Sequence, residues 1–112
     1  MFARFALGFA ALASVSTACF ADEPMTSQQI LKLAPGTFTA VVKGKWQITV
    51  RLSRDGVITG KAGKITDEGR WAVRGDQLCI VMPTFTRGRV ECSEVVADSG
   101  WYRGRNVAFQ PL

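Results

Sequence analysis

The chain has 112 residues, with 14 Lys or Arg against 9 Asp or Glu and no histidine. This length predicts one domain with a small core. The absence of histidine excludes the Ser–His and Cys–His nucleophile pairs and removes the side chain best suited to proton transfer near neutral pH. The formal net charge of +5 does not decide between an anionic partner and a solvated basic surface.

The N-terminus has the pattern of an export signal. Arg4 is the only charged residue of the first 21, and an almost uninterrupted apolar run follows from Phe5 to Val15. Small residues then lead to Ala21, before an acidic start of the remaining chain. This order is typical of a cleavable signal peptide. The apolar run is also shorter than the roughly 20 residues that a transmembrane helix needs.

We expect cleavage after Ala21, with a cut after Ala18 as the alternative. Two further alternatives are an uncleaved anchor and a lipoprotein acylated at Cys19, although Ser16 stands where such signals carry an aliphatic residue. Cleavage after Ala21 leaves residues 22–112 as a single β-rich domain, periplasmic or secreted.

A short helix is expected at the start of this domain. Thr26 can cap its N-terminus, and Gln29 can reach back to the cap, which is the capping-box pattern. Ile30 and Leu33 fall on one face of the helix. Pro35-Gly36 ends it after about two turns, which we expect to lie across one end of a sheet.

From Thr37 onward, apolar and polar residues alternate with the period of a β-strand. The clearest strand is Trp46 to Leu52, and Asp55-Gly56 after it indicates a hairpin turn. Strands are predicted at 37–42, 46–52, 57–62, 70–73, 77–82, 89–96 and 101–103; residues 63–69 form a polar connection, and 106–109 end the sheet. About seven short strands predict a mainly β fold, a small antiparallel barrel or sandwich whose helix plugs one end.

Two cysteines, Cys79 and Cys92, remain once the leader is removed. An even pair in a small exported domain predicts a disulfide, which closes a loop of about 14 residues. If the two cysteines face each other across a hairpin, Val81 pairs with Val90 on the same face. We expect that face to point inward.

The opposite face of this hairpin is the predicted binding surface. It presents Ile80 and Met82, and Phe85 stands at the hairpin tip, where an exposed aromatic side chain is a contact anchor. Arg87 and Arg89 follow the tip in the sequence. These five residues are the candidate binding site.

The chain has no pattern that indicates catalysis, a cofactor or a metal. Asp55, Asp67, Asp76 and Asp98 lie beside or near glycine in turns, where a carboxylate accepts hydrogen bonds from the local backbone. Two thiols without histidine do not form a zinc site. The glycine-rich segment 60–64 lacks the spacing of a phosphate loop and is interpreted as a turn. We therefore expect a protein that is not an enzyme and has no cofactor or metal.

Two sets of side chains admit two interpretations each. The aromatic residues form the core or line a barrel-mouth pocket for an apolar ligand; they are Phe38, Trp46, Trp71, Phe85, Trp101, Tyr102 and Phe109. The basic residues are a solvated outer face or a surface for membrane headgroups, a cell-wall polymer or an acidic protein. They are Arg51, Arg54, Lys61, Lys64, Arg70, Arg74, Arg87, Arg89, Arg103 and Arg105.

Several motifs follow the helix in a fixed order. They are Asp55-Gly56, Gly69-Arg70-Trp71, Leu78-Cys79-Ile80 and then Cys92. In this order the chain resembles small exported domains of proteobacteria whose activity is not established. The resemblance covers nearly the whole mature chain and implies a periplasmic β-domain. It carries over no catalytic residue.

We therefore predict a non-enzymatic periplasmic or secreted binding module. The expected partner is a protein or an anionic envelope component, with no nucleic acid and no transmembrane span after cleavage. One alternative is a carrier of a small ligand, which needs an enclosed pocket larger than about 300 Å³. The other is an inhibitor of a cell-wall hydrolase or protease, by fold-level analogy with periplasmic lysozyme inhibitors.

Overall fold

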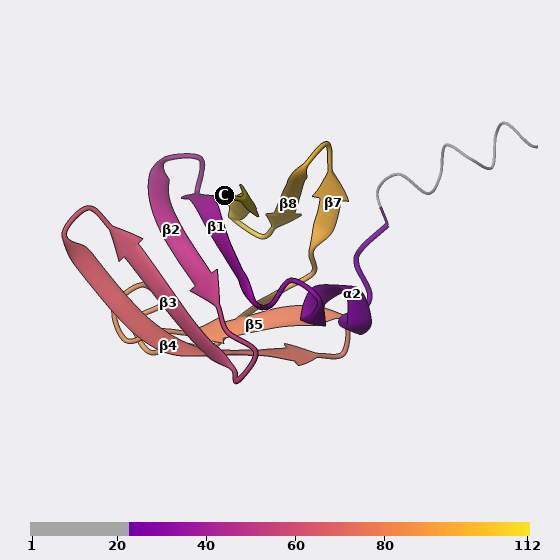
Figure 1. The fold of residues 1–112 in the computed structure, drawn as a ribbon, viewed down its shortest axis with the longest axis horizontal. Helices are drawn as coiled ribbons and strands as arrows, with labels where there is room; N and C mark the ends of the chain where they lie inside the picture. Colours follow the sequence, from indigo (N-terminus) through magenta and orange to yellow (C-terminus); the bar gives the residue numbers. More distant parts are fainter. Residues whose placement is uncertain (1–22) are drawn as a thin grey trace, which may run out of the picture.

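The computed structural model describes residues 23–112, so the predicted signal peptide, its cleavage sites and Cys19 lie outside the described residues. The described chain forms one short helix and nine strands (Figure 1). These elements are α2 (Ser27–Leu31), β1 (Gly36–Val42), β2 (Trp46–Leu52), β3 (Val57–Ala62), β4 (Ile65–Arg74), β5 (Gln77–Val81), β6 (Glu91–Ser93), β7 (Val96–Asp98), β8 (Trp101–Gly104) and β9 (Val107–Pro111). The fold is mainly β, as predicted.

All nine strands belong to one antiparallel sheet, in the order β6-β5-β4-β3-β2-β1-β9-β8-β7. The two edge strands, β6 and β7, are consecutive in the chain and are joined only by Glu94 and Val95. Two residues can join opposite edges only if the sheet curls round, and the sheet is therefore an antiparallel half-barrel. Val95 is buried at this crossing, where its carbonyl accepts a hydrogen bond from the Met25 amide at 2.7 Å.

The structure has two strands more than the predicted seven, because the predicted strand 89–96 is divided between β6 and β7 and because the last segment, which was not counted as a strand, forms β9. Residues 89–96 are not one strand, because the chain leaves one sheet edge after Ser93 and joins the other at Val96. Residues 63–69 are not a loop, because all but the turn at 63–64 belong to β4. Exposed polar residues such as Glu68 gave this strand the composition of a connection.

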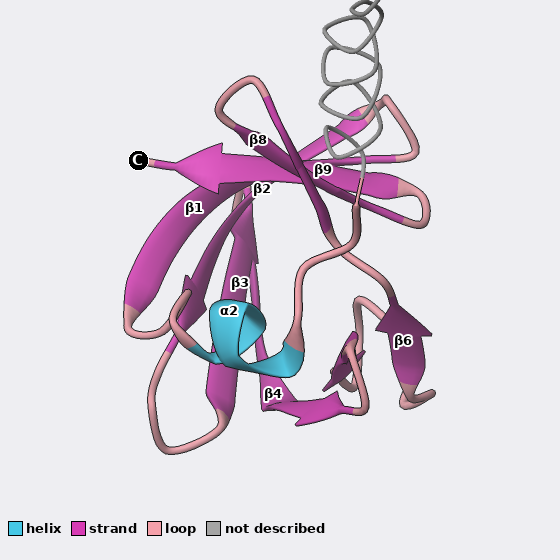
Figure 2. Cartoon of the chain, turned by 90° about the vertical axis from the view of Figure 1, so that its right-hand side faces the viewer, coloured by secondary structure: helices cyan, strands magenta, loops and turns pink. Residues whose placement is uncertain are grey.

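The helix is capped as predicted. The Thr26 hydroxyl accepts a hydrogen bond from the Gln29 amide at 3.3 Å, and the Gln29 side chain accepts one from the Thr26 amide at 2.9 Å. The Asp76 carboxylate in the β4–β5 turn accepts hydrogen bonds from the Ser27 amide and hydroxyl, both at 2.8 Å. These bonds fasten α2, whose Ile30 is fully buried, across one end of the curled sheet (Figure 2).

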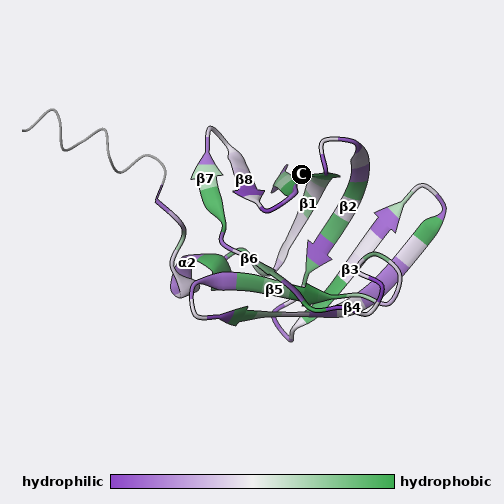
Figure 3. Ribbon diagram, turned by 180° about the vertical axis from the view of Figure 1, so that it is seen from behind, coloured by the Kyte–Doolittle hydropathy of each residue, from purple (hydrophilic) through white to green (hydrophobic). Residues whose placement is uncertain are grey.

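The core occupies the inner face of the sheet. Apolar and polar bands alternate along β2, β3 and β4 (Figure 3), as expected of strands with one apolar face. The buried cluster consists of Ile30, Leu33, Ala34, Phe38, Ala40, Leu52, Ile58, Trp71, Met82, Val95 and Phe109. Phe38 and Phe109 meet edge to face with ring centroids 5.3 Å apart. Residues from α2 and the segment after it, from five strands and from the crossing thus share one core.

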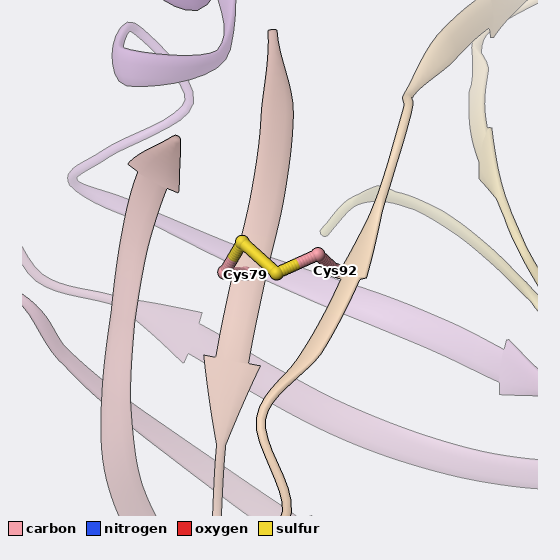
Figure 4. The surroundings of a disulfide bond; sticks show 2 residues. All are labelled: Cys79 and Cys92. Carbon is pink, nitrogen blue, oxygen red and sulfur yellow. A yellow bond between two sulfur atoms is a disulfide. The ribbon is translucent and has the colours of Figure 1, made fainter. Parts of the chain in front are cut away.

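The predicted disulfide between Cys79 and Cys92 is confirmed, and these residues are direct partners in the β5–β6 ladder (Figure 4). The expectation that the face carrying Ile80 is the open one is wrong. Ile80 pairs with the buried Trp71 and packs against the core. Because neighbouring residues on a strand point to opposite faces, Cys79 projects from the other face of β5, where it is nevertheless only 3% exposed.

The expected pair of Val81 with Val90 is also not formed. The β5–β6 ladder ends at Ile80 and Glu91, so Val81 pairs with Arg70 of β4 on one side and has no strand partner on the other within the described residues. Val90 lies outside the strands with 54% of its surface exposed. The disulfide therefore ties a three-residue edge strand to β5, and its Cys79 end is buried, with 3% of the residue surface exposed.

Replacing both Cys79 and Cys92 with alanine is expected to lower the free energy of unfolding by about 3 kcal/mol, because the disulfide limits the unfolded chain. Urea unfolding monitored by tryptophan fluorescence measures this. Chemical reduction of the wild-type protein should give the same loss. An unchanged urea midpoint in both experiments would contradict this role of the disulfide.

Candidate functional site

The predicted binding surface on β5 does not have the expected exposure. Met82 is only 2% exposed, and Ile80 is a half-buried residue packed against the core. The prediction that these two side chains face away from the core is therefore wrong. The cause is the register with β4, which places Ile80 on the same face as Trp71.

Phe85 lies on the sheet and is half-buried, instead of standing exposed at a loop tip. Its ring packs so closely on Gly60 of β3 that a Cβ atom there would lie 2.6 Å from the ring. The Asp67 carboxylate holds the loop in place, accepting hydrogen bonds from the amides of Thr84 at 2.8 Å and Phe85 at 2.9 Å.

The remaining two candidates, Arg87 and Arg89, are exposed beside this loop. The structure thus separates the five predicted residues into two side chains that pack in the core region, one that is packed on the sheet, and two free to contact solvent. A role of Phe85, Arg87 and Arg89 in binding stays a prediction.

The aspartate side chains form hydrogen bonds and one ion pair that stabilise the fold. Asp55 accepts a local hydrogen bond from the Val57 amide at 3.3 Å, as predicted. Asp67 and Asp76 differ from Asp55, because their carboxylates accept hydrogen bonds from segments that are distant in the sequence. Asp98 pairs with Arg103 at 2.9 Å; the hydrogen bond from Arg103, helped by one from Ser99, lowers the pKa of Asp98. Within residues 23–112, His, Cys, Asp and Glu side chains form no group of three that could hold a metal ion.

The register brings three turns to one end of the sheet. Val42 pairs with both Trp46 and Val107, so the β1–β2 turn (43–45) and the β8–β9 turn (105–106) lie together. The Lys43 amide donates a hydrogen bond to the Asn106 carbonyl at 2.6 Å. The β3–β4 turn (63–64) lies at the same end, because β3 runs alongside β2 in antiparallel register. We call this the tip end (Figure 1).

Apolar side chains continue along the inner face of the sheet to the tip end. We define the apolar rim as Val42, Trp46, Ile48, Ala62, Ile65 and Val107. Ile48 pairs with the core residue Ala40, and alternation along β2 places Trp46 on the same face. In the same way, Ile65 pairs with Ala62, which shares a face with Gly60. Trp46 is 58% exposed and Ile65 is 55% exposed.

The same turns carry a cluster of positive charge. Lys43 and Lys45 flank the first tip, Lys61 and Lys64 flank the second, and Arg105 lies in the third turn; all five are exposed. The segments 42–50, 60–66 and 104–110 contain no Asp or Glu. The Lys45 ammonium lies 5.2 Å from the centre of the Trp46 ring, within reach of a cation–π interaction.

The turns at the opposite end of these hairpins are mixed in charge. The β2–β3 turn carries Arg54 beside Asp55, and the β4–β5 turn carries Arg74 near Asp76. The five cations of the tip end equal the net charge of residues 23–112, because the eight other Lys and Arg are balanced by eight Asp and Glu, of which Asp67 and Glu68 directly follow segment 60–66. Lys45 and Lys64 directly precede the two exposed apolar residues, Trp46 and Ile65, in the sequence.

Sequence reasoning missed this site. Trp46 was expected in the core or a pocket, because a strand of period two normally buries its aromatic face. The available signal was that both tips repeat one pattern, with Lys43-Gly44-Lys45-Trp46 in one hairpin and Lys61-Ala62-Gly63-Lys64-Ile65 in the other. Each pattern places a large apolar residue directly after a lysine of the turn.

The structure also bears on the carrier hypothesis, which needs an enclosed pocket. Two depressions of about 630 and 800 Å³ are present, and both are open to solvent. The first lies at the seam between β6 and β8, with Arg103, Arg105 and Glu94 in its wall. The second lies beside Trp101 and Lys43. Neither has the enclosed shape that the carrier hypothesis requires.

Comparison with protein-family models, with curated proteins and with solved structures finds no match to this chain. The resemblance to exported proteobacterial domains therefore stays an expectation. Among the helices of the described residues, none has the length and apolar character needed to cross a membrane.

Replacing Asp67 with alanine is expected to lower the free energy of unfolding by about 1–3 kcal/mol, because two loop amides lose a charged acceptor. Hydrogen exchange of the Thr84 and Phe85 amides should become faster. Asp55→Ala removes only a local acceptor and is the matched control. It should lower the free energy of unfolding by less than Asp67→Ala does. Exchange rates that are unchanged in Asp67→Ala would contradict the fastening role of this carboxylate.

Proposed function

We propose that this protein is a non-enzymatic binding module that acts outside the cytoplasm and binds an anionic partner through the tip end. The observation that carries the proposal is the pair of exposed apolar side chains, Trp46 and Ile65, each flanked by lysines on neighbouring hairpins. An interaction site that combines apolar contact with positive charge suits a partner with both apolar and negative groups.

The position of the charges supports binding better than solubility alone. A surface that serves only solubility carries both signs mixed together, as the turns at 53–56 and 74–77 do. The tip end instead carries five cations, and its three segments contain no carboxylate. Like charges on neighbouring hairpins raise the local potential, which increases the encounter rate with an anion.

Two features support a location outside the cytoplasm. The N-terminal sequence has the pattern of a signal peptide, and the Cys79–Cys92 disulfide is of the kind that persists in oxidising compartments. The chain's chemistry supports the non-enzymatic part of the proposal. It has no histidine, and Asp67, Asp76 and Asp98 are already engaged in structural hydrogen bonds.

Retention on an anionic matrix tests the proposal. A variant with Lys43, Lys45, Lys61 and Lys64 changed to glutamine should elute from immobilised heparin at much lower salt than the wild-type protein. The reason is that each contact with an anionic group contributes to the salt dependence of binding.

The matched control changes Lys32, Arg51, Arg54 and Arg74 to glutamine, which removes the same net charge from exposed positions elsewhere on the surface. This control should elute close to the wild-type position. Equal elution of the two variants would show that net charge alone causes retention, and the proposed site would be rejected.

A further inference from the structure

We infer that the anionic partner is the surface of a lipid bilayer, with Trp46 and Ile65 inserted among the lipids; this inference rests on the proposed function. Both side chains lie next to hairpin turns at the end of the sheet, and each is more than half exposed. A side chain near the end of a projecting hairpin can enter a lipid layer without any change in the fold.

The residue types at the two tips suit the lipid–water interface. Tryptophan is enriched at that interface because its ring is apolar and its indole N–H is polar. The transfer of an isoleucine side chain from water to the acyl region lowers the free energy. A lysine directly precedes each of them, and a lysine stem can lie along an apolar surface while its ammonium stays at the headgroups.

The charges give the preference for anionic lipid. Phosphate-rich headgroups attract each lysine near the surface, and the attraction of several lysines adds up. The cluster comprises Lys43, Lys45, Lys61, Lys64 and Arg105, all exposed and without a carboxylate in their segments. The apolar and electrostatic contributions act at the same two hairpins, as in peripheral proteins that need two signals to stay on a membrane.

Other occupants fit this surface less well. A second copy of the chain would bring its own five cations against these five, and the repulsion opposes a symmetric dimer. An anionic polysaccharide gives the cations partners but leaves Ile65 exposed to water. A stable protein interface buries about 800 Å² on each partner around a packed centre, whereas the large exposed side chains here stand on separate tips.

Vesicle sedimentation tests the inference with the purified protein. Phosphatidylcholine vesicles that contain phosphatidylglycerol should bind the protein, and pure phosphatidylcholine vesicles should bind it weakly. The double variant Trp46→Ser with Ile65→Ser should lose about tenfold or more in affinity. The double variant Leu31→Ser with Val90→Ser, which replaces exposed apolar residues elsewhere, should bind like the wild type.

The four-lysine variant is an independent test of the electrostatic contribution. Its affinity for the anionic vesicles should fall by about fivefold for each lysine removed. Lipids brominated on the acyl chains add a spectroscopic readout. They should quench the fluorescence of the wild-type protein through Trp46. In Trp46→Phe, which keeps an apolar tip, the quenching should disappear while binding remains.

The outcomes separate this inference from the proposed function. If the tip lysines control retention on heparin but vesicles do not bind, the lipid inference is wrong and the partner is an anionic polymer or an acidic protein. If vesicles bind equally well with and without the tip side chains, the lipid inference is wrong, and the proposed function is rejected as well only if heparin retention is also independent of the tip lysines. Quenching that persists in Trp46→Phe would also overturn insertion at this tip.

Discussion

The structure depends on one constraint, which is that the chain crosses from one edge of the sheet to the other through Glu94 and Val95 alone. This crossing forces nine strands to curl into a half-barrel. The buried Val95 also binds the Met25 amide, so the segment that leads into α2 is anchored at the same place. The curl, the helix position and the enclosed core therefore form one cooperative arrangement.

The curl also separates the inner face of the sheet into a covered part and an open part. α2 closes one end of the sheet, and Phe85 covers the inner face at Gly60. Within residues 23–112, the inner-face side chains beyond that point, Trp46 and Ile65, stay more than half exposed. Strand alternation fixes the direction in which these two side chains point. A surface without a partner does not need exposed apolar side chains, so their apolar character indicates a contact.

The sequence predicted the local features well, because they depend on neighbouring residues. The capping box at Thr26 and Gln29, the turn at Asp55-Gly56 and the disulfide partners follow from residue type and spacing. The sequence could not predict which face of β5 points inward, because the pairing of Ile80 with Trp71 decides it. The site was missed for a related reason: the exposure of Trp46 depends on where the core ends, which is a property of the whole sheet.

The most direct test of the central claim is to map, by NMR, which backbone amides shift when the labelled protein is titrated with short-chain phosphatidylglycerol. Binding at the tip end predicts that the shifts cluster in the turns 43–46, 61–65 and 104–107. Shifts that cluster instead in the 83–90 loop, or in the turns 53–56 and 74–77, would contradict the assignment of the tip end as the binding site.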